Sequence, residues 1–496
     1  MNQTARLSAA ALADLPAEWA RPAYDRSQPC GVVHLGTGAF HRAHQACFFD
    51  ALLAAGHEGW MIRGASLRSP AVAQAMNPQD GLFTVLVRNG GEERAQVVGS
   101  VRDVLVAPDD PAALVRALAD PAVALVTLTV TEKGYCLDPA TGSLRADDPA
   151  VAADIANIAA PQTAPGFLVA GLAARRAAGA LPFTVLSCDN LPDNGQRTRA
   201  AVIALAEAVD PALAAWIAAE VAFPSSMVDR IVPATTPDDL DNFESATGWR
   251  DEALVKTEPF TQWVVEDWFS GRRPPLDQVG VQFTRDVAGW EKAKLRMLNG
   301  AHSAIAYLGG LAGHQHVHQA MAAPGFGALI EALWDEAEAT LDPVDGFDPA
   351  AYRAQLRARF ANGALMHRTH QIAMDGSQKL PQRWLQTITA TRRADRPVPP
   401  ALTLALAGWI RWQAGVSDAG VPFVVDDPLA AETFAALSAA DGDRAAEVRG
   451  LLAIGAIFGS ELSADADFVA ALTRAYAAIA DGSATGAVRG FAGERG

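Results

Sequence analysis

The stretch Val32-Val-His-Leu-Gly36-Thr-Gly38-Ala-Phe-His-Arg42 decides the fold of the first half of this chain. An apolar run ends at a pair of glycines, and a segment with helical spacing follows. Glycines in this place permit a tight turn and a close backbone approach, and a helix N-terminus offers free N–H groups to phosphate. His41 stands where the usual G-x-G-x-x-G pattern has its third glycine. The stretch therefore predicts either a site for a dinucleotide pyrophosphate or a purely structural strand–turn–helix junction.

Short apolar runs alternate with helical segments throughout the first half. Further strands are expected at residues 60–65, 82–87, 123–130 and 183–187, and helices at 41–53, 111–119 and 165–178. Strands that alternate with helices indicate a parallel sheet with helices on its faces. The setting at the first strand of such a pattern favours the dinucleotide site.

The texture changes from about Trp290 onward, where long Ala/Leu-rich stretches with helical spacing replace the β-branched runs. Helices are expected at residues 297–311, 326–341, 402–413 and 465–480. We therefore predict an α/β fold with two domains. Residues 1–284 form a dinucleotide-binding domain around a parallel sheet, and residues 285–496 form a mostly α-helical substrate and catalytic domain.

Composition excludes several classes of protein. Half of the 496 residues are hydrophobic and 19% are charged, which rules out disordered and fibrous chains. The net charge of −16 would repel a nucleic acid. The four cysteines form no C-x-x-C pair, so neither a disulfide framework nor a zinc ribbon is indicated. Residues 1–22 lack a signal peptide pattern, and no apolar stretch approaches the ~20 residues of a membrane span. We expect a cytoplasmic protein without nucleic-acid or membrane partners.

The second stretch with chemical character is Lys294-Leu-Arg-Met-Leu-Asn299-Gly-Ala-His302, on a predicted helix. At about 100° per residue its three polar side chains, at i, i+5 and i+8, fall within an arc of roughly 140°. A lysine of depressed pKa is a competent acid–base for an alcohol proton, and the amide and imidazole can donate hydrogen bonds to a carbonyl oxygen. The alternative is a solvated helix face.

Two loops place short polar groups after apolar runs. Asn190 follows the strand at 183–187, where ligands bind in open α/β sheets. Asp229 precedes Arg230, and this pair is either a substrate-side group or a structural salt bridge. After the second strand no acidic residue is found to hold the adenosine ribose, and Arg68 there offers a partner for a 2′-phosphate. The choice between NAD and NADP stays open on these residues.

The histidines His314, His316 and His318 suggest a metal site, because the outer two are four residues apart on an expected helix. A catalytic zinc site also needs a third ligand and an open position, which nothing nearby supplies. We therefore expect no metal and interpret them as a solvent-facing cluster. Cys188 has no partnered histidine and is interpreted as a packing residue.

Five motifs, taken together in this order, resemble the polyol-specific long-chain dehydrogenases. This family contains mannitol 2-dehydrogenases, fructuronate reductases, tagaturonate reductases and arabinitol dehydrogenases. The resemblance runs from about Gly31 to about Ala477 and reverses the interpretation of Lys294 as a solvated residue. The motifs are Gly36-x-Gly38-x-Phe40-x-Arg42, Thr129-Val-Thr-Glu132-Lys133-Gly134-Tyr135-Cys136, Ser187-Cys-Asp-Asn190, Met227-Val-Asp229-Arg230-Ile and Lys294-x4-Asn299-x2-His302.

The resemblance implies a Rossmann-type N-terminal domain, a helical C-terminal domain, NAD as cofactor, metal-independent hydride transfer and a monomer. It also implies a role for each matched residue. Lys294 would be the general acid–base, Asn190 and Asn299 would stabilise the reacting oxygen, His302 would orient it, Asp229 would bind a substrate hydroxyl, and Glu291 would relay the lysine proton. The cofactor would be bound by Gly36, Gly38, Phe40, Arg42 and, from the argument above, Arg68.

Within the family, Glu132-Lys133-Gly134-Tyr135-Cys136 and the segment from His367 to Arg383 are most similar to fructuronate reductase, also called D-mannonate oxidoreductase. A uronate carries a carboxylate, so a cationic partner is expected. The candidates are Lys133, Arg368, Lys379 and Arg383. The resulting hypothesis is NAD-dependent reduction of D-fructuronate to D-mannonate. The alternatives are a mannitol 2-dehydrogenase or arabinitol dehydrogenase acting on a neutral polyol, and a catalytically silent sugar-acid or nucleotide sensor.

Overall fold

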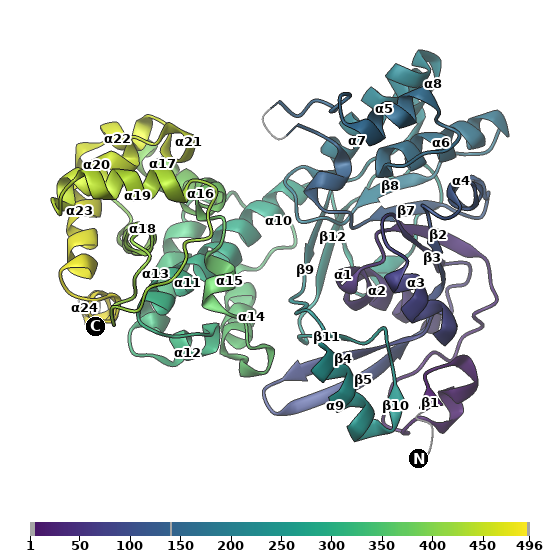
Figure 1. Cartoon of the computed structure of the whole chain (residues 1–496), viewed down its shortest axis with the longest axis horizontal. Helices are drawn as coiled ribbons and strands as arrows, with labels where there is room; N and C mark the ends of the chain where they lie inside the picture. The colour runs from purple at the N-terminus through teal and green to yellow at the C-terminus, as the bar shows by residue number, and fades with distance from the viewer. Residues whose placement is uncertain (1–4, 139–140, 494–496) are drawn as a thin grey trace. The chain divides into compact units, whose positions relative to one another are not determined.

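The computed structural model describes residues 5–138 and 141–493 (Figure 1). The chain divides into two compact units, Met1–Ala288 (unit 1) and Gly289–Gly496 (unit 2). The sequence places the domain boundary at residue 284, shortly before this division. Among the described residues, no helix combines the length and the apolar character that a membrane span requires.

A five-stranded parallel sheet forms the centre of unit 1. Its strands are β2 (Cys30–Leu35), β3 (Met61–Ser66), β6 (Val101–Val106), β7 (Leu125–Leu128) and β8 (Thr184–Ser187). Their spatial order is β6-β3-β2-β7-β8, and all neighbours are parallel. Counted along the chain this is 3-2-1-4-5, the order of a Rossmann sheet. The order reverses between β2 and β7, and ligands of such sheets bind beyond the strand ends at that point.

Each face of this sheet has its own apolar core. Val32 and Leu125 belong to the core that includes side chains of α2 (Gln45–Ala54) and α3 (Ala71–Met76). Their sequence neighbours Val33 and Val126 belong to the opposite core, because side chains alternate along a strand. The helices of that second core are α4 (Pro111–Ala119), α5 (Pro149–Ala156), α6 (Ala164–Ala177), α7 (Asn194–Val209) and α8 (Pro211–Glu220). Burial on both faces explains why these strands read as continuous apolar runs.

Two expectations for unit 1 are wrong in detail. The run at 82–87 is β4 (Phe83–Asn89), but it lies outside the parallel sheet. A two-residue Gly90-Gly91 turn returns the chain as β5 (Glu92–Val98), and the resulting hairpin pairs with β11 (Val255–Thr257). The outer place in the parallel sheet goes to β6, which the sequence analysis did not identify. The expected helix at 41–53 is α1 (Ala39–Ala43) followed by α2, separated at His44, whose ψ of −88° is not helical.

A third sheet of unit 1 carries one of the predicted site residues. Its strands are β9 (Ser226–Asp229), β12 (Gln262–Glu266) and β13 (Gln282–Thr284), in the order β13-β12-β9. Asp229 is the last residue of β9 and pairs in register with Gln262. Asp229 is therefore a buried residue at the carboxyl end of a strand.

Unit 2 is helical throughout its described residues, as predicted. Every residue of α11 (Gly300–Leu311) is buried, which makes this helix the centre of the unit. The remaining long helices are α13 (Phe326–Glu338), α14 (Pro349–Ala361), α18 (Pro400–Trp412) and α23 (Ala466–Ala480). Shorter helices are α10 (Val287–Ala293), α12 (Val317–Ala322), α15 (Thr369–Ala373), α16 (Gly376–Leu380), α17 (Gln386–Arg393), α19 (Ala430–Ala439), α20 (Arg444–Leu452) and α24 (Ala484–Gly493).

Candidate active site

The glycine turn after β2 lies at the point where the strand order reverses. Gly36 has a φ of +94°, a conformation that residues with a side chain rarely adopt. Its N–H donates to the carbonyl of Ala65, and a Cβ there would come within 2.2 Å of the carbonyl oxygen of Thr129. The turn therefore requires glycine for both conformation and space. This close approach of β2, β3 and β7 leaves the backbone of the turn open to a ligand.

A buried histidine holds this turn in place. His34 is fully buried, with Nδ1 2.7 Å from Thr127 Oγ1 and Nε2 2.9 Å from Thr129 Oγ1. Thr129 Oγ1 in turn donates to the carbonyl of Gly36, 2.7 Å away. Burial lowers the pKa of His34 to about 3, so the ring is neutral at physiological pH. This network was not predicted, although His34, Thr127 and Thr129 stand out as polar residues within apolar runs.

His41, which replaces the third glycine, stacks on His34 with 3.5 Å between ring centroids. The ring is fully buried, and burial lowers the pKa of His41 well below its ordinary value. Two stacked neutral imidazoles thus occupy the space beneath the turn. The third glycine of the G-x-G-x-x-G pattern is thus replaced by a histidine that packs on His34, and the first two glycines are retained.

The other predicted cofactor residues have different surroundings. Arg42 donates to the carbonyl oxygens of Gly38 and Ala253, so it braces the turn from behind. Phe40 is half-buried and stacks on His44 at 5.0 Å. Arg68 is exposed beyond the end of β3. A cavity of about 580 Å³ runs from the glycine turn to Arg68 and across to Lys133. Its size and its glycine-lined wall fit a dinucleotide.

Asp189, in the motif that contains Asn190, fixes one wall of this cavity. Its carboxylate accepts hydrogen bonds from the amides of Val130 (3.0 Å) and Thr131 (2.9 Å) and from the hydroxyl of Tyr135 (2.6 Å). Burial raises the pKa of Asp189, and these three hydrogen bonds oppose the rise. Asp189 and Tyr135 both belong to the sequence motifs, but no role was predicted for either residue. Their contact ties the end of β8 to the loop after β7.

This clamp determines where two predicted site residues lie. Lys133 is exposed on the 3₁₀ turn η3 (Glu132–Tyr135) and lines the dinucleotide cavity. Asn190 is exposed directly after Asp189, at the carboxyl end of β8. Arg230, next to the buried Asp229, donates to the carbonyl oxygens of Glu258 and Ala43. Arg230 therefore has a structural role, because its guanidinium is hydrogen-bonded to backbone carbonyl oxygens.

Lys294, Asn299 and His302 lie on one continuous helical stretch of unit 2, but the helix is not regular. Residues Lys294–Asn299 form a π-helical turn, η5, between α10 and α11. The amide of Gly300 donates to the carbonyl of Leu295, five residues earlier. In a π-helix, residues five apart lie about one turn above each other, so Lys294 and Asn299 share a face. The regular helix assumed from the sequence would separate them by roughly 140°.

His302 lies one turn further along, in a pocket of aromatic and cationic side chains. Its ring is 4.6 Å from the Phe360 ring and 5.2 Å from the His367 ring. Burial lowers the pKa of His302 well below its ordinary value, and the charges of His367, Arg359 and Arg383 act in the same direction. The imidazole is therefore neutral at physiological pH. It can donate one hydrogen bond and accept another.

A second π-helical turn, η7 (Pro381–Leu385), contacts the first. It follows from Pro381, which has no N–H to donate within a helix. Arg383 of this turn donates to Ser303 Oγ (2.7 Å) and to the carbonyl of Asn299 (3.4 Å). Trp384 Nε1 donates to the carbonyl of Gly300 (3.0 Å). Three hydrogen bonds thus join η7 to the last residue of η5 and to the first turn of α11.

Three further predicted site residues of unit 2, Lys379, Arg368 and Glu291, differ in their surroundings. Lys379 donates to the carbonyl of Met374 and lies 3.6 Å from Asp375 Oδ2. Burial lowers the pKa of Lys379, and the charge of Arg383 lowers it further. Arg368 is exposed at the start of α15. Glu291 is half-buried on α10, one turn before Lys294. Arg359 and Ser303 were not predicted as site residues, because single residues within amphipathic helices carry no motif.

The histidines considered for a metal do not share a helix. α12 begins at Val317, so His314 lies in the preceding loop and His316 at the helix N-cap. The i, i+4 placement expected from the sequence is therefore wrong, because α11 ends at Leu311. No metal-binding group of three His, Cys, Asp or Glu side chains occurs within residues 5–138 and 141–493.

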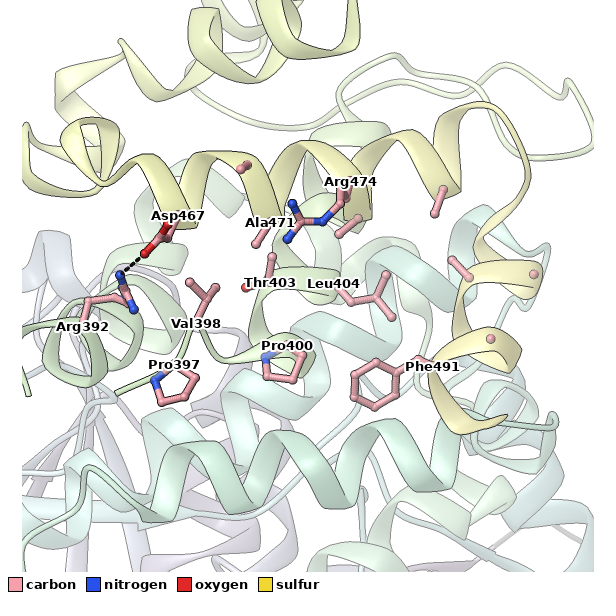
Figure 2. Close-up of a pocket in the computed structure, with 16 residues that line it drawn as sticks. Arg392, Pro397, Val398, Pro400, Thr403, Leu404, Asp467, Ala471, Arg474 and Phe491 are labelled. Carbon is pink, nitrogen blue, oxygen red and sulfur yellow. Dashed lines mark hydrogen bonds and ion pairs between the residues drawn. The ribbon is translucent and has the colours of Figure 1, made fainter. Parts of the chain in front are cut away.

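A larger hollow of unit 2, of about 900 Å³, contains none of the predicted catalytic residues (Figure 2). Its walls are mainly small or apolar side chains of α18, α23 and α24, such as Leu404, Ala471 and Phe491. At one end Arg392 lies 3.4 Å from Asp467, so these two charges face each other. Its charged lining residues are Arg392, Arg474 and Asp467.

Two family models match the chain: the mannitol dehydrogenase Rossmann domain over residues 30–278 and the mannitol dehydrogenase C-terminal domain over residues 286–480. The chain belongs to the mannitol dehydrogenase family. Members of the family resemble it over almost their whole length. The uncharacterized oxidoreductase YdfI of Escherichia coli K12 is 44% identical over 94% of this chain and 96% of its own. The D-mannonate oxidoreductase of the same organism is 42% identical over 92% and 95%.

A solved structure of the family supports the same assignment. The mannitol 2-dehydrogenase of Pseudomonas fluorescens, in a ternary complex with NAD and D-mannitol, is 38% identical. It matches 98% of this chain and 99% of its own, with a TM-score of 0.82. This mannitol dehydrogenase family member is therefore an oxidoreductase that acts on CH–OH groups.

Proposed function

We propose that this chain catalyses the NAD-dependent, reversible reduction of the C5 ketone of D-fructuronate to D-mannonate. The observation that carries the proposal is the cationic surrounding of His302. Arg359 and Arg383 both lie close enough to lower its pKa, and Arg359 is buried. Cations around the reacting groups attract an anionic substrate, and the carboxylate of a sugar acid supplies that charge whereas a neutral polyol does not.

Arg383 is the favoured carboxylate partner among the predicted candidates. Burial lowers its pKa to about 10, so the guanidinium remains charged at neutral pH. It already uses Nη1 on Ser303 and Asn299, which fixes its orientation. Lys379 is engaged with Met374, and Lys133 lines the dinucleotide cavity of unit 1. An oriented guanidinium matches the two oxygens of a carboxylate better than a lysine does.

The residues of the glycine turn would hold NADH, whose nicotinamide supplies the hydride for the substrate carbonyl carbon. Lys294 would donate its proton to the carbonyl oxygen during reduction and accept it in the reverse direction. Asn299, and Asn190 of unit 1, would donate hydrogen bonds to the same oxygen as charge develops on it. Neutral His302 would orient the oxygen, Asp229 would bind a substrate hydroxyl, and Glu291 would pass the lysine proton to solvent.

The second candidate is oxidation of a neutral polyol, as in a mannitol 2-dehydrogenase or arabinitol dehydrogenase. The likeness to the mannitol 2-dehydrogenase complex with D-mannitol favours it. Both candidates would use the same lysine and asparagines, so the reaction itself does not separate them. Substrate charge does, because only the uronate needs a cationic partner.

The deciding experiment compares D-fructuronate with D-fructose at equal concentrations. NADH oxidation by the purified enzyme is followed at neutral pH without added metal. A strong preference for fructuronate is the expected result, and a preference for fructose would assign a mannitol 2-dehydrogenase instead. We also propose a cytoplasmic monomer, for which gel filtration should give a mass near 52.0 kDa.

A further inference from the structure

The adenosine end of the dinucleotide cavity lacks the group that normally selects NAD. In Rossmann domains an Asp or Glu after the second strand binds the ribose 2′-hydroxyl and repels a 2′-phosphate. Here β3 ends at Ser66, and Leu67-Arg68-Ser69-Pro70 follows. All of Ser66, Leu67, Arg68 and Ser69 line the cavity. No carboxylate occupies this corner to repel a phosphate.

The turn after β3 is held by its own hydrogen bonds. Ser66 Oγ donates to the carbonyl of Ser69 (2.6 Å), and the amide of Ala71 donates to Ser69 Oγ (3.2 Å). Ser69 Oγ accepts in this contact, so its hydroxyl can still donate a hydrogen bond. Arg68 lies between the two serines and is exposed, and its side chain has neither a hydrogen bond nor an ion pair with the described part of the chain. A guanidinium and a hydroxyl are donors suited to phosphate oxygens.

The charge of the whole cavity acts in the same direction. Its lining includes the cations Arg68, Lys133 and Arg145. Among the described lining residues, Asp148 is the sole carboxylate, and it is engaged: it lies 3.0 Å from Arg145 and accepts from the amide of Ala150. The wall therefore keeps two positive charges that are not neutralised within it, which favours an anionic ligand. The pyrophosphate is common to NADH and NADPH, so Arg68, next to the end of β3, is the cation that bears on a 2′-phosphate.

We propose that this cavity binds 2′-phosphorylated dinucleotides, NADPH as well as NADH, and that Arg68 with the hydroxyl of Ser69 binds the 2′-phosphate. The inference rests on the proposed dinucleotide-dependent function, but it concerns binding alone. Arg68 takes no part in the acid–base chemistry proposed for Lys294. Its effect is confined to the difference between the two cofactors.

Isothermal titration calorimetry of the full-length enzyme tests this inference without any sugar substrate. The probes are NADPH, NADH, and the fragments 2′,5′-ADP and 5′-AMP, which differ only in the 2′-phosphate. Wild-type enzyme should bind 2′,5′-ADP more tightly than 5′-AMP, by about tenfold for one charge-assisted contact. Arg68→Gln should weaken NADPH and 2′,5′-ADP by about tenfold and leave NADH and 5′-AMP within about twofold. Ser69→Asp should reverse the preference by repelling the phosphate.

Arg94→Gln is the matched control, because Arg94 is an exposed arginine of the same unit on β5. It should leave all four affinities unchanged. The inference is overturned if wild-type enzyme binds NADPH and 2′,5′-ADP much more weakly than NADH and 5′-AMP. It is also overturned if Arg68→Gln weakens all four probes equally, since Arg68 would then be a general cavity residue. If none of the four probes binds, the proposed dinucleotide-dependent function fails together with it.

Discussion

Arg383, on the π-helical turn η7, donates a 2.7 Å hydrogen bond to the hydroxyl of Ser303 on α11. The same guanidinium reaches the carbonyl of Asn299, 84 residues earlier in the chain. π-helical turns are rare and occur frequently at functional sites, where tertiary contacts maintain them. In unit 2 one such turn aligns Lys294 with Asn299, and the other holds Arg383 against it. Substitutions at these positions therefore test chemistry and alignment separately.

Replacing Lys294 by alanine should lower kcat by about 10²–10⁴, because the proton donor is lost from the transition state. The Kd for NADH, measured by fluorescence titration, should remain within about twofold, since the lysine is not expected to bind cofactor. Lys292→Ala is the control, because Lys292 lies on α10 two residues before Lys294. Its Nζ is 3.0 Å from Asp342 Oδ2. Equal losses in the two variants would show that helix integrity, and not the proton, is being measured.

Arg383→Gln should raise the KM for D-fructuronate by about 10- to 100-fold, as expected for loss of a charge-assisted contact. The KM for NADH should not change. Arg383→Lys should recover part of the loss, because it restores charge without the planar fork. Arg368→Gln, at an exposed arginine, is the comparison. A larger effect in Arg368→Gln would transfer the carboxylate contact to that residue.

Asp189→Asn should destabilise unit 1, because an amide cannot accept all three hydrogen bonds from Val130, Thr131 and Tyr135. The free energy of unfolding in urea should fall by about 1–3 kcal/mol. The KM for NADH should rise, since the clamped loop carries Lys133 into the dinucleotide cavity. Tyr135→Phe removes one of the three bonds and should have a smaller effect on both quantities. Unchanged stability in Asp189→Asn would exclude the clamp.

The buried histidines of unit 1 should make its stability sensitive to mild acid. The pKa of His34 is about 3 in the folded chain and 6.5 in its ordinary state, so the unfolded chain binds a proton that the folded chain does not. This contribution is complete above pH 6.5 and is lost as the pH falls toward the folded value. Each such histidine gives a slope of about 1.4 kcal/mol per pH unit.

Urea unfolding between pH 6.5 and 5, before most carboxylates titrate, measures this slope. His34→Gln keeps polar atoms near Thr127 and Thr129 but removes the ionisable ring. It should therefore flatten the slope by about one proton's worth. His41 stacks on the same ring and should add a second, similar contribution. A slope identical to that of wild-type enzyme would mean that His34 is protonated in the folded state.

The order of the secondary structure was largely predictable because the parallel strands of unit 1 are buried on both faces. Such strands leave unbroken apolar runs, and the helices between them keep a 3.6-residue period. The hairpin of β4 and β5 was not recognised as separate, since an apolar run carries no label for the sheet it joins. The outer strand β6 was missed because Arg102 and Asp103 interrupt its apolar pattern. Partner choice is a property of the packed chain.

The candidate active site likewise has features that the sequence determines and features that only chain packing decides. The sequence by itself determined which residue types were available: the glycine pair after β2, the motif from Lys294 to His302, and the missing acid after β3. The folded chain alone shows that Lys294 and Asn299 share a face, because the π-helical turn that aligns them is not encoded by a local motif; Arg383 of η7 donates to the carbonyl of Asn299 at its end. It also decided that Asp189 is a clamp and that Arg359 lies near His302. Local sequence carries backbone preferences, whereas hydrogen bonds between distant segments exist only once the chain has packed.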